Sequence, residues 1–201
     1  MEFEPAANLI RAELPAGPRV AVLGSTSFFS PLSEGVSIAL GRGLATLPGL
    51  ALLTGGVSGV GQTVARAFHD ARDQAKLERR VFHLLPQGMD ELDYGTTLFT
   101  GSSMSDRREV LARVAPIYVV IEGGPGTAHE SEVALAAGAT LVPIAATGGH
   151  ALDLYGRLAP PGTIALGDWL ALGQEELGPD ILAATATRIT AALLGVEPSS
   201  D

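Results

Sequence analysis

The feature that most constrains the fold is a series of short apolar runs, several of which end at glycine or proline. The clearest is 117–121, which stops at Glu122 and is followed by the glycine-rich stretch 123–126. A short continuous apolar run between turn residues is typical of a strand buried on both faces. The segments expected to form strands are 19–23, 50–54, 81–85, 96–100, 117–121, 141–144 and 163–166.

Segments with helical spacing separate these runs. Pro31 is well placed in the first turn of one such segment, and Ser102 or Ser103 is suited to cap another. The expected helices are 31–47, 62–77, 102 or 103 to 114, 127–137 and 179–194, with 86–95 and 147–149 as loops. Strands that alternate with helices predict an α/β fold in three layers, a Rossmann-like, mainly parallel sheet with helices on both faces.

Composition narrows the class of protein. The chain has 201 residues, of which 46% are hydrophobic and 17% charged, so a packed core is expected rather than disorder. No internal repeat or long linker divides it, and we expect a single Rossmann-like nucleotide-binding domain over 1–201, with its motifs in 19–145.

Charge and cysteine content exclude several functions. The net charge of −9 and the lack of a basic stripe argue against nucleic acid as a partner. The sequence has no cysteine, which excludes disulfides and thiolate chemistry. We see no signal-peptide pattern and no apolar run of about 18 residues, so we expect a cytoplasmic protein with no membrane partner.

Three strand exits, after residues 23, 54 and 121, are rich in glycine. In a parallel sheet these exits share one edge, and ligands bind in the crevice there. Glycine lets backbone N–H groups approach an anion. A helix that begins after the glycines stabilises the anion further, because the N-terminus is the positive end of the helix dipole. The residues predicted to bind phosphate or nucleotide are Gly24, Ser25, Gly55, Gly56, Gly59, Gly123, Gly124, Gly126 and Thr127.

Glu130 lies just beyond the third exit, where a carboxylate would repel a bound phosphate. We therefore expect it to reach sugar hydroxyls or a reacting carbon. An alternative is a plain acid in the first helical turn, stabilised by the helix dipole. For Arg107 the corresponding alternative is a solvated helix residue.

The sequence does not match the common nucleotide-binding motifs. The glycines at 56, 59 and 61 lack the GxGxxG spacing, and no acid ends the following strand to hold a ribose, which disfavours a dehydrogenase. The sequence contains no GxxxxGK(S/T), which excludes a P-loop. The four histidines lack metal-ligand spacing, so we predict no metal site.

The motifs taken together resemble the LOG family. Gly-Ser follows the first strand, Gly-Gly-x-x-Gly the second, and an arginine pair in Met-Ser-Asp-Arg107-Arg108 precedes Gly-Gly-Pro-Gly-Thr-Ala-His-Glu130. LOG proteins are cytokinin riboside 5′-monophosphate phosphoribohydrolases, long mislabelled as lysine decarboxylases, within the SLOG superfamily of nucleotide-binding Rossmann-like proteins. The resemblance covers roughly residues 19–145.

The resemblance implies hydrolysis of a nucleoside 5′-monophosphate to a free base and ribose 5-phosphate. Glu130 would stabilise the developing positive charge on the ribose and orient or deprotonate water. Arg107 would clamp phosphate or assist the departing base, and Arg108 is assigned to nucleotide binding. The resemblance implies a homodimer, and the chemistry needs neither a metal nor a cofactor. The expected partner is a nucleoside monophosphate or another phosphorylated small molecule.

Departures from the family pattern keep a second function open. Glu122 stands where the family has proline, and His129 stands where it often has a second acid. Such drift is typical of more distant SLOG branches, which resemble molybdenum-cofactor carriers or nucleotide-binding domains that bind without cleaving. A decarboxylase is disfavoured because the only lysine, Lys76, lies in a charged helix end.

Overall fold

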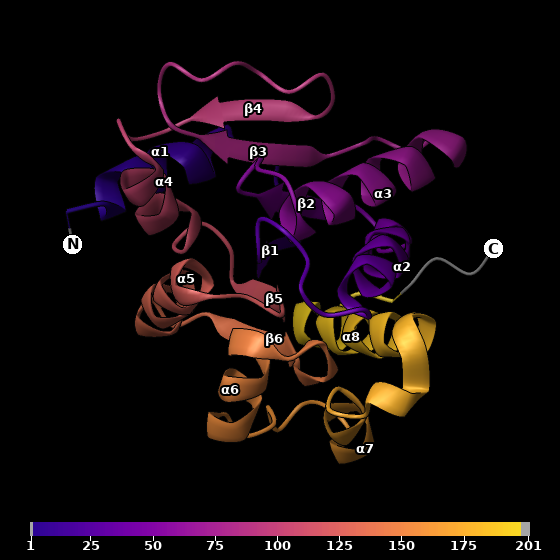
Figure 1. The fold of residues 1–201 in the computed structure, drawn as a ribbon. Helices are drawn as coiled ribbons and strands as arrows, with labels where there is room; N and C mark the ends of the chain where they lie inside the picture. Colours follow the sequence, from indigo (N-terminus) through magenta and orange to yellow (C-terminus); the bar gives the residue numbers. More distant parts are fainter. Residues whose placement is uncertain (1, 198–201) are drawn as a thin grey trace.

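A parallel six-stranded sheet with the strand order β4-β3-β2-β1-β5-β6 forms the centre of the protein (Figure 1). The computed structural model describes residues 2–197. Every neighbouring pair of strands is parallel, which confirms the predicted α/β fold class. The strands are β1 (Arg19–Gly24), β2 (Ala51–Thr54), β3 (Val81–Leu85), β4 (Thr96–Phe99), β5 (Ile117–Ile121) and β6 (Thr140–Ile144).

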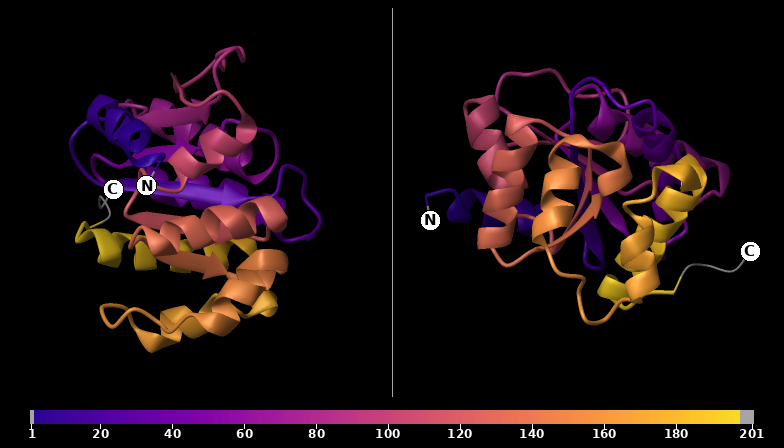
Figure 2. Two further views of the ribbon diagram at one scale, coloured as in Figure 1. Left: turned by 90° about the vertical axis from the view of Figure 1, so that its left-hand side faces the viewer. Right: turned by 60° about the horizontal axis from the view of Figure 1, so that its bottom comes forward.

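Helices cover both faces of this sheet (Figure 1 and Figure 2). One apolar core lies under α2, α3 and α8, and the other lies under α1, α4, α5 and α6. The helices are α1 (Glu4–Glu13), α2 (Ser33–Ala45), α3 (Val60–Gln74), α4 (Met104–Leu111), α5 (Pro125–Ala136), α6 (Gly149–Arg157), α7 (Leu166–Ala171) and α8 (Gly178–Leu194). Short 3₁₀ turns occupy Ala145–Thr147 and Glu175–Leu177.

Alternate residues of each central strand enter opposite cores. In β1, Val20 and Val22 belong to the core under α2, whereas Ala21 and Leu23 belong to the core under α5. Successive side chains of a strand point to opposite faces, so a strand covered on both sides must be apolar throughout. This burial explains why the central strands read as continuous apolar runs.

The strand order reverses between β1 and β5, and this reversal positions the ligand crevice. The chain adds β2, β3 and β4 on one side of β1 and then returns to place β5 on the other side. Leu23 pairs with Val120 and Gly24 with Ile121, so the carboxyl ends of β1 and β5 are neighbours. A reversal of this kind opens a crevice beyond the carboxyl ends of the strands.

The expected strand over 163–166 is wrong. Residues 162–164 form a turn and bend, and α7 begins at Leu166. The amide of Ile164 donates to the carbonyl of Pro161 at 3.1 Å, which closes this turn immediately after two prolines. Local hydrogen bonding therefore prevails over the apolar composition of the segment.

Three helices, α1, α6 and α7, were not predicted. In the N-terminal segment, α1 buries Ala7 and Ile10 and packs against α4. In the segment expected to be a loop, α6 starts at Gly149 and buries Ala151 and Leu154. Within residues 2–197, no helix is long and apolar enough to cross a membrane.

Helix α2 lies close to α3 because Gly41 faces it. A methyl group added at Gly41 would come within 2.4 Å of the Val64 carbonyl oxygen and 2.9 Å of the Phe68 amide nitrogen, both backbone atoms of α3. Backbone atoms cannot move aside as the end of a side chain can. The separation of α2 and α3 therefore depends on a residue without a side chain.

The buried side chain of His83, in β3, contacts the residue that precedes the glycine-rich loop after β2. Its Nδ1 lies 3.0 Å from the Thr54 hydroxyl, which also accepts from the Gly56 amide at 3.3 Å. The ring packs edge-on against Tyr94, with centroids 4.8 Å apart. Burial, helped by the positive charge of Arg66, lowers the pKa of His83 to about 4.

Gly41→Ala is expected to lower the free energy of unfolding by about 1–3 kcal/mol, because overpacking against α3 outweighs the helix propensity gained. Gly156→Ala is the matched control, since an added methyl there contacts nothing within 4 Å in α6. That variant should be stabilised by about 0.5 kcal/mol. Urea denaturation of both variants measures the difference, and equal shifts would contradict the packing argument.

The free energy of unfolding is expected to fall as the pH drops from about 6.5 towards 4. Unfolded His83 takes up a proton near 6.5, whereas folded His83 resists protonation until about 4. By pH 5 this residue alone costs about 2 kcal/mol relative to pH 7. Urea denaturation at both pH values, in the parent and in His83→Gln, isolates the contribution. An unchanged pH dependence in the variant would contradict the assignment.

Candidate functional site

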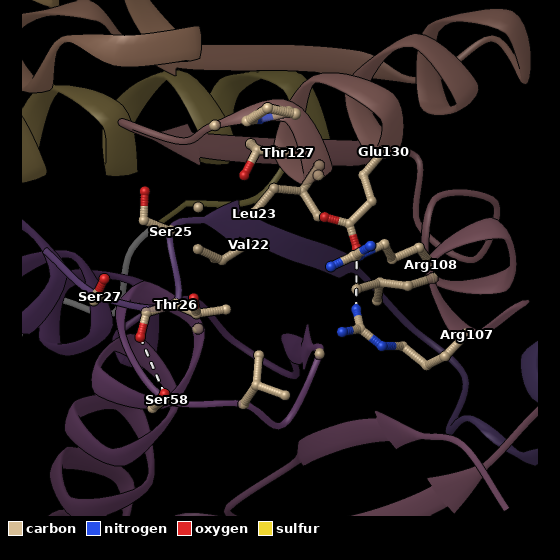
Figure 3. Close-up of a pocket in the computed structure, with 18 of the residues that line it drawn as sticks. Val22, Leu23, Ser25, Thr26, Ser27, Ser58, Arg107, Arg108, Thr127 and Glu130 are labelled. Carbon is tan, nitrogen blue, oxygen red and sulfur yellow. Dashed lines mark hydrogen bonds and ion pairs between the residues drawn. The ribbon is translucent and has the colours of Figure 1, made fainter. Parts of the chain in front are cut away.

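A pocket of about 340 Å³ lies at the carboxyl ends of β1, β2 and β5. Its volume is within the range of about 300–1,000 Å³ that is usual for small-molecule sites. The loop after β1, the loop after β2, α4 and the start of α5 form its walls. Figure 3 shows Ser25, Ser27 and Ser58 on one side of the pocket, with Arg107 and Glu130 on the other.

Two helix N-termini meet at this pocket. The first-turn residues Gly126 and Thr127 of α5 and Gly61 of α3 belong to its lining. Neither helix has a side-chain cap or an acidic residue in its first turn. Amides in the first turn of a helix have no acceptor within the helix, and the dipole makes that end positive. The arrangement favours an anion such as phosphate.

A buried ion pair occupies the opposite wall. Nη1 of Arg107 donates to Oε1 of Glu130 at 3.0 Å, and both side chains are more than 90% buried. Arg107 comes from α4 and Glu130 from the second turn of α5, so the two helices place the pair between them. Because Glu130 lies beyond the first turn and is paired, the alternative of a plain first-turn acid does not describe it.

Burial affects the two members of the pair in opposite directions. Loss of solvent raises the pKa of Glu130, although the charges of Arg107 and Arg108 favour its ionised form. Loss of solvent also lowers the pKa of Arg107. A buried ion pair is weak evidence for stability, because desolvation offsets most of the attraction. Both members of the pair line the pocket.

Gly55 makes room for the Arg107 guanidinium. A methyl group added at Gly55 would lie 2.5 Å from Nη1 of Arg107 and 2.9 Å from its Cζ. The glycine at the exit of β2 thus lets the guanidinium lie flat against the backbone. Any larger residue would displace Arg107 from Glu130.

Arg108 is a cation without an anionic partner within residues 2–197. It lines the pocket, and a methyl group added at Gly126 would lie 3.3 Å from its Nη2. The guanidinium is therefore next to the uncapped start of α5. Together they present a fork of N–H donors suited to a phosphate.

Most predicted site residues line the pocket, and the others shape the loops around it. The lining contains Gly24, Ser25, Gly55, Arg107, Arg108, Gly124, Gly126, Thr127 and Glu130. Gly56, Gly59 and Gly123 lie outside the lining and have φ angles of +65°, +85° and +105°. Their contribution is a backbone conformation that side chains disfavour.

The sequence did not single out several neighbours of this site. Phe29, Thr26, Ser27, Val57 and Ser58 line the pocket, but their residue types carry no chemical signal by themselves. Within residues 2–197, no group of three or more histidine, cysteine, aspartate or glutamate side chains is arranged to hold a metal ion.

Glu122 was noted only as a departure from a family pattern. The structure places it at the end of β5, fully buried, with φ at +44°. Its Oε2 accepts hydrogen bonds from the Ser33 hydroxyl at 2.7 Å and from the Ser30 amide at 3.2 Å. The carboxylate therefore ties the loop after β5 to the start of α2.

The fold and the pocket define a Rossmann-like protein with a pocket of small-molecule size at the switch point of its sheet. The profile of the SLOG cluster4 family matches residues 18–155. The chain belongs to this family, which confirms the expected SLOG membership.

Solved structures agree with this assignment. The protein TM1055 is 28% identical with a TM-score of 0.59, and the match covers 76% of this chain and 88% of that one. The molybdenum cofactor carrier protein of Chlamydomonas reinhardtii is 26% identical with a TM-score of 0.53, covering 62% of this chain and 74% of that one. A second structure of that carrier is also 26% identical, with a TM-score of 0.51. The match covers 63% of this chain and 75% of that one. A search of curated proteins finds no match.

Arg108→Ala is expected to weaken the binding of inorganic phosphate at least tenfold, because a charged hydrogen bond contributes about 1.5–3 kcal/mol. The fold should not lose stability, since Arg108 has no ion pair to break. The matched control is Arg42→Ala, which removes an exposed arginine of α2. Calorimetric titration with phosphate measures both, and an equal loss of affinity would point to net charge rather than to this site.

Proposed function

We propose that this protein binds a nucleoside 5′-monophosphate and hydrolyses its N-glycosidic bond to a free base and ribose 5-phosphate. The observation that carries the proposal is the buried Arg107–Glu130 pair in the wall of a pocket with two uncapped helix N-termini. The resemblance of the motifs to the LOG family supports the same reaction.

The donors of the pocket suggest how such a ligand would bind. The amides of Gly126 and Thr127 and the guanidinium of Arg108 suit the phosphate. The ribose would then lie towards the carboxylate of Glu130 from α5. Ser25, at the exit of β1, would close the other side.

Glu130 and Arg107 suit the bond cleavage. The electron pair of the C1′–N bond leaves with the base, and positive charge builds on the ribose. The Glu130 carboxylate stabilises this charge and takes a proton from the water whose oxygen bonds to C1′. The departing base takes up one proton, so one water is consumed in total. Arg107 favours the ionised form of Glu130, whereas burial raises its pKa.

A second candidate is a carrier that binds its ligand without cleaving it. The similarity to the molybdenum cofactor carrier protein of Chlamydomonas reinhardtii, at 26% identity, favours this candidate. A molybdenum-cofactor-like ligand would be cargo in this case, held by the same phosphate-binding amides. Glu130 would then bind the ligand rather than react.

Glu130→Gln is expected to lower kcat for nucleoside monophosphate hydrolysis at least a hundredfold, because the amide cannot accept the proton. Ligand affinity should change by no more than a few fold, since the amide oxygen can still accept from Arg107. Chromatography of free base and ribose 5-phosphate released from AMP and related monophosphates gives the rate. Calorimetry gives the affinity.

The matched control is Glu132→Gln, which makes the same change at an exposed position of α5. It should leave turnover unchanged. Hydrolysis by the parent that persists in Glu130→Gln would remove Glu130 from the reaction. Binding without hydrolysis in the parent would establish the carrier instead.

A further inference from the structure

Phe29 is an exposed aromatic side chain in the wall of the pocket. It is 60% exposed, and among the described residues it is the only strongly exposed large apolar side chain that also lines this pocket. A phenylalanine in contact with solvent loses the free energy that burial would provide. An exposed aromatic ring in a ligand pocket is therefore a candidate contact for an apolar surface of the ligand.

The ring of Phe29 lies close to the first residue of α6. A methyl group added at Gly149 would lie 2.7 Å from Cζ of Phe29 and 2.7 Å from the carbonyl oxygen of Gly123. The edge of the ring thus lies against the start of α6, next to the glycines that precede α5. From there the ring forms part of the pocket wall.

Glu122 fixes the backbone that carries Phe29. Its Oε2 accepts from the Phe29 amide at 3.4 Å, from the Ser30 amide at 3.2 Å and from the Ser33 hydroxyl at 2.7 Å. The residue is fully buried and has φ at +44°, a backbone conformation that is strained for a residue with a side chain. A strained, buried carboxylate persists only where its surroundings hold it in place.

Two further bonds hold Glu122 itself. Its amide donates to the Thr147 hydroxyl at 2.7 Å, and its carbonyl accepts from the Ala151 amide at 3.0 Å. The loops after β1, β5 and β6 are thereby joined at Glu122, through its carboxylate and its backbone. Phe29 is consequently presented in a preorganised position rather than on a free loop.

We propose that Phe29 determines specificity by packing on the face of a planar heteroaromatic ring of the phosphorylated ligand, and that Glu122 is the residue that positions it. This inference rests on the proposed binding of a phosphate in the same pocket. The ring can belong to a nucleobase or to a pterin, because both are flat and heteroaromatic. It applies equally to a hydrolase and to a carrier.

The test compares two phosphorylated probes, of which only the first carries a heteroaromatic ring. The first is the carbocyclic analogue of AMP, which lacks the ribose oxygen needed to stabilise positive charge and therefore resists cleavage. The second is ribose 5-phosphate. Stacking of a base on an aromatic side chain contributes about 1–3 kcal/mol, or about five- to 150-fold in affinity. The parent is expected to bind the AMP analogue at least tenfold more tightly than ribose 5-phosphate.

Phe29→Ala should remove most of this preference and leave the affinity for ribose 5-phosphate unchanged, whereas Phe29→Tyr should retain it. An equal loss for both probes in Phe29→Ala would overturn the inference while leaving phosphate binding intact. The inference about Phe29 would also be overturned if the parent bound both probes with equal affinity. Failure of the parent to bind either probe would overturn the proposed function as well. Neopterin monophosphate in place of the AMP analogue distinguishes a pterin from a nucleobase.

The role of Glu122 is tested by a double-mutant cycle. Glu122→Gln keeps the shape of the side chain and should reduce the ring preference in the parent, but not in the Phe29→Ala background. A merely structural role would give the same change in both backgrounds. Ser33→Ala removes one donor to Glu122 and provides the same readout if Glu122→Gln does not fold.

Discussion

The parallel pairing of β1 with β5 is the constraint on which the candidate site depends. It places the exits after Gly24 and Ile121 side by side, at the point where the strand order reverses. A methyl group at Gly24 would approach the Ile121 carbonyl oxygen to 2.6 Å, so the two exits touch through their backbones. The start of α5 thereby faces the loop after β1, and a pocket opens between them.

Local charge in this pocket is opposite to the charge of the whole chain. The protein carries a net charge of −9, yet the pocket contains two helix N-termini and the guanidinium of Arg108. Such donors act over a few ångströms, whereas the acidic surface is screened by salt. Glu130 introduces one negative charge, which Arg107 compensates at 3.0 Å. The anion site and the carboxylate can therefore coexist in one pocket.

Glu122 shows why a departure from a family pattern can be informative. Read along the sequence, it is a charged residue at a position where proline is usual. In the structure, its buried carboxylate connects the end of β5 to the first turn of α2, between residues 89 positions apart. The bond to Ser33 also places the carboxylate at the N-terminus of α2. The departure thus alters how the wall of the pocket is held.

The sequence by itself determined the fold class, the strands β1 to β6 and the edge where the pocket lies. Continuous apolar runs require a sheet covered on both faces, and glycines at several strand ends mark one shared edge. Only the tertiary structure decided that Arg107 pairs with Glu130, that 163–166 is not a strand, and that Phe29 lines the pocket. These features arise from contacts between distant or competing groups. Neither residue type nor periodicity records such contacts, because both describe only a residue and its neighbours along the chain.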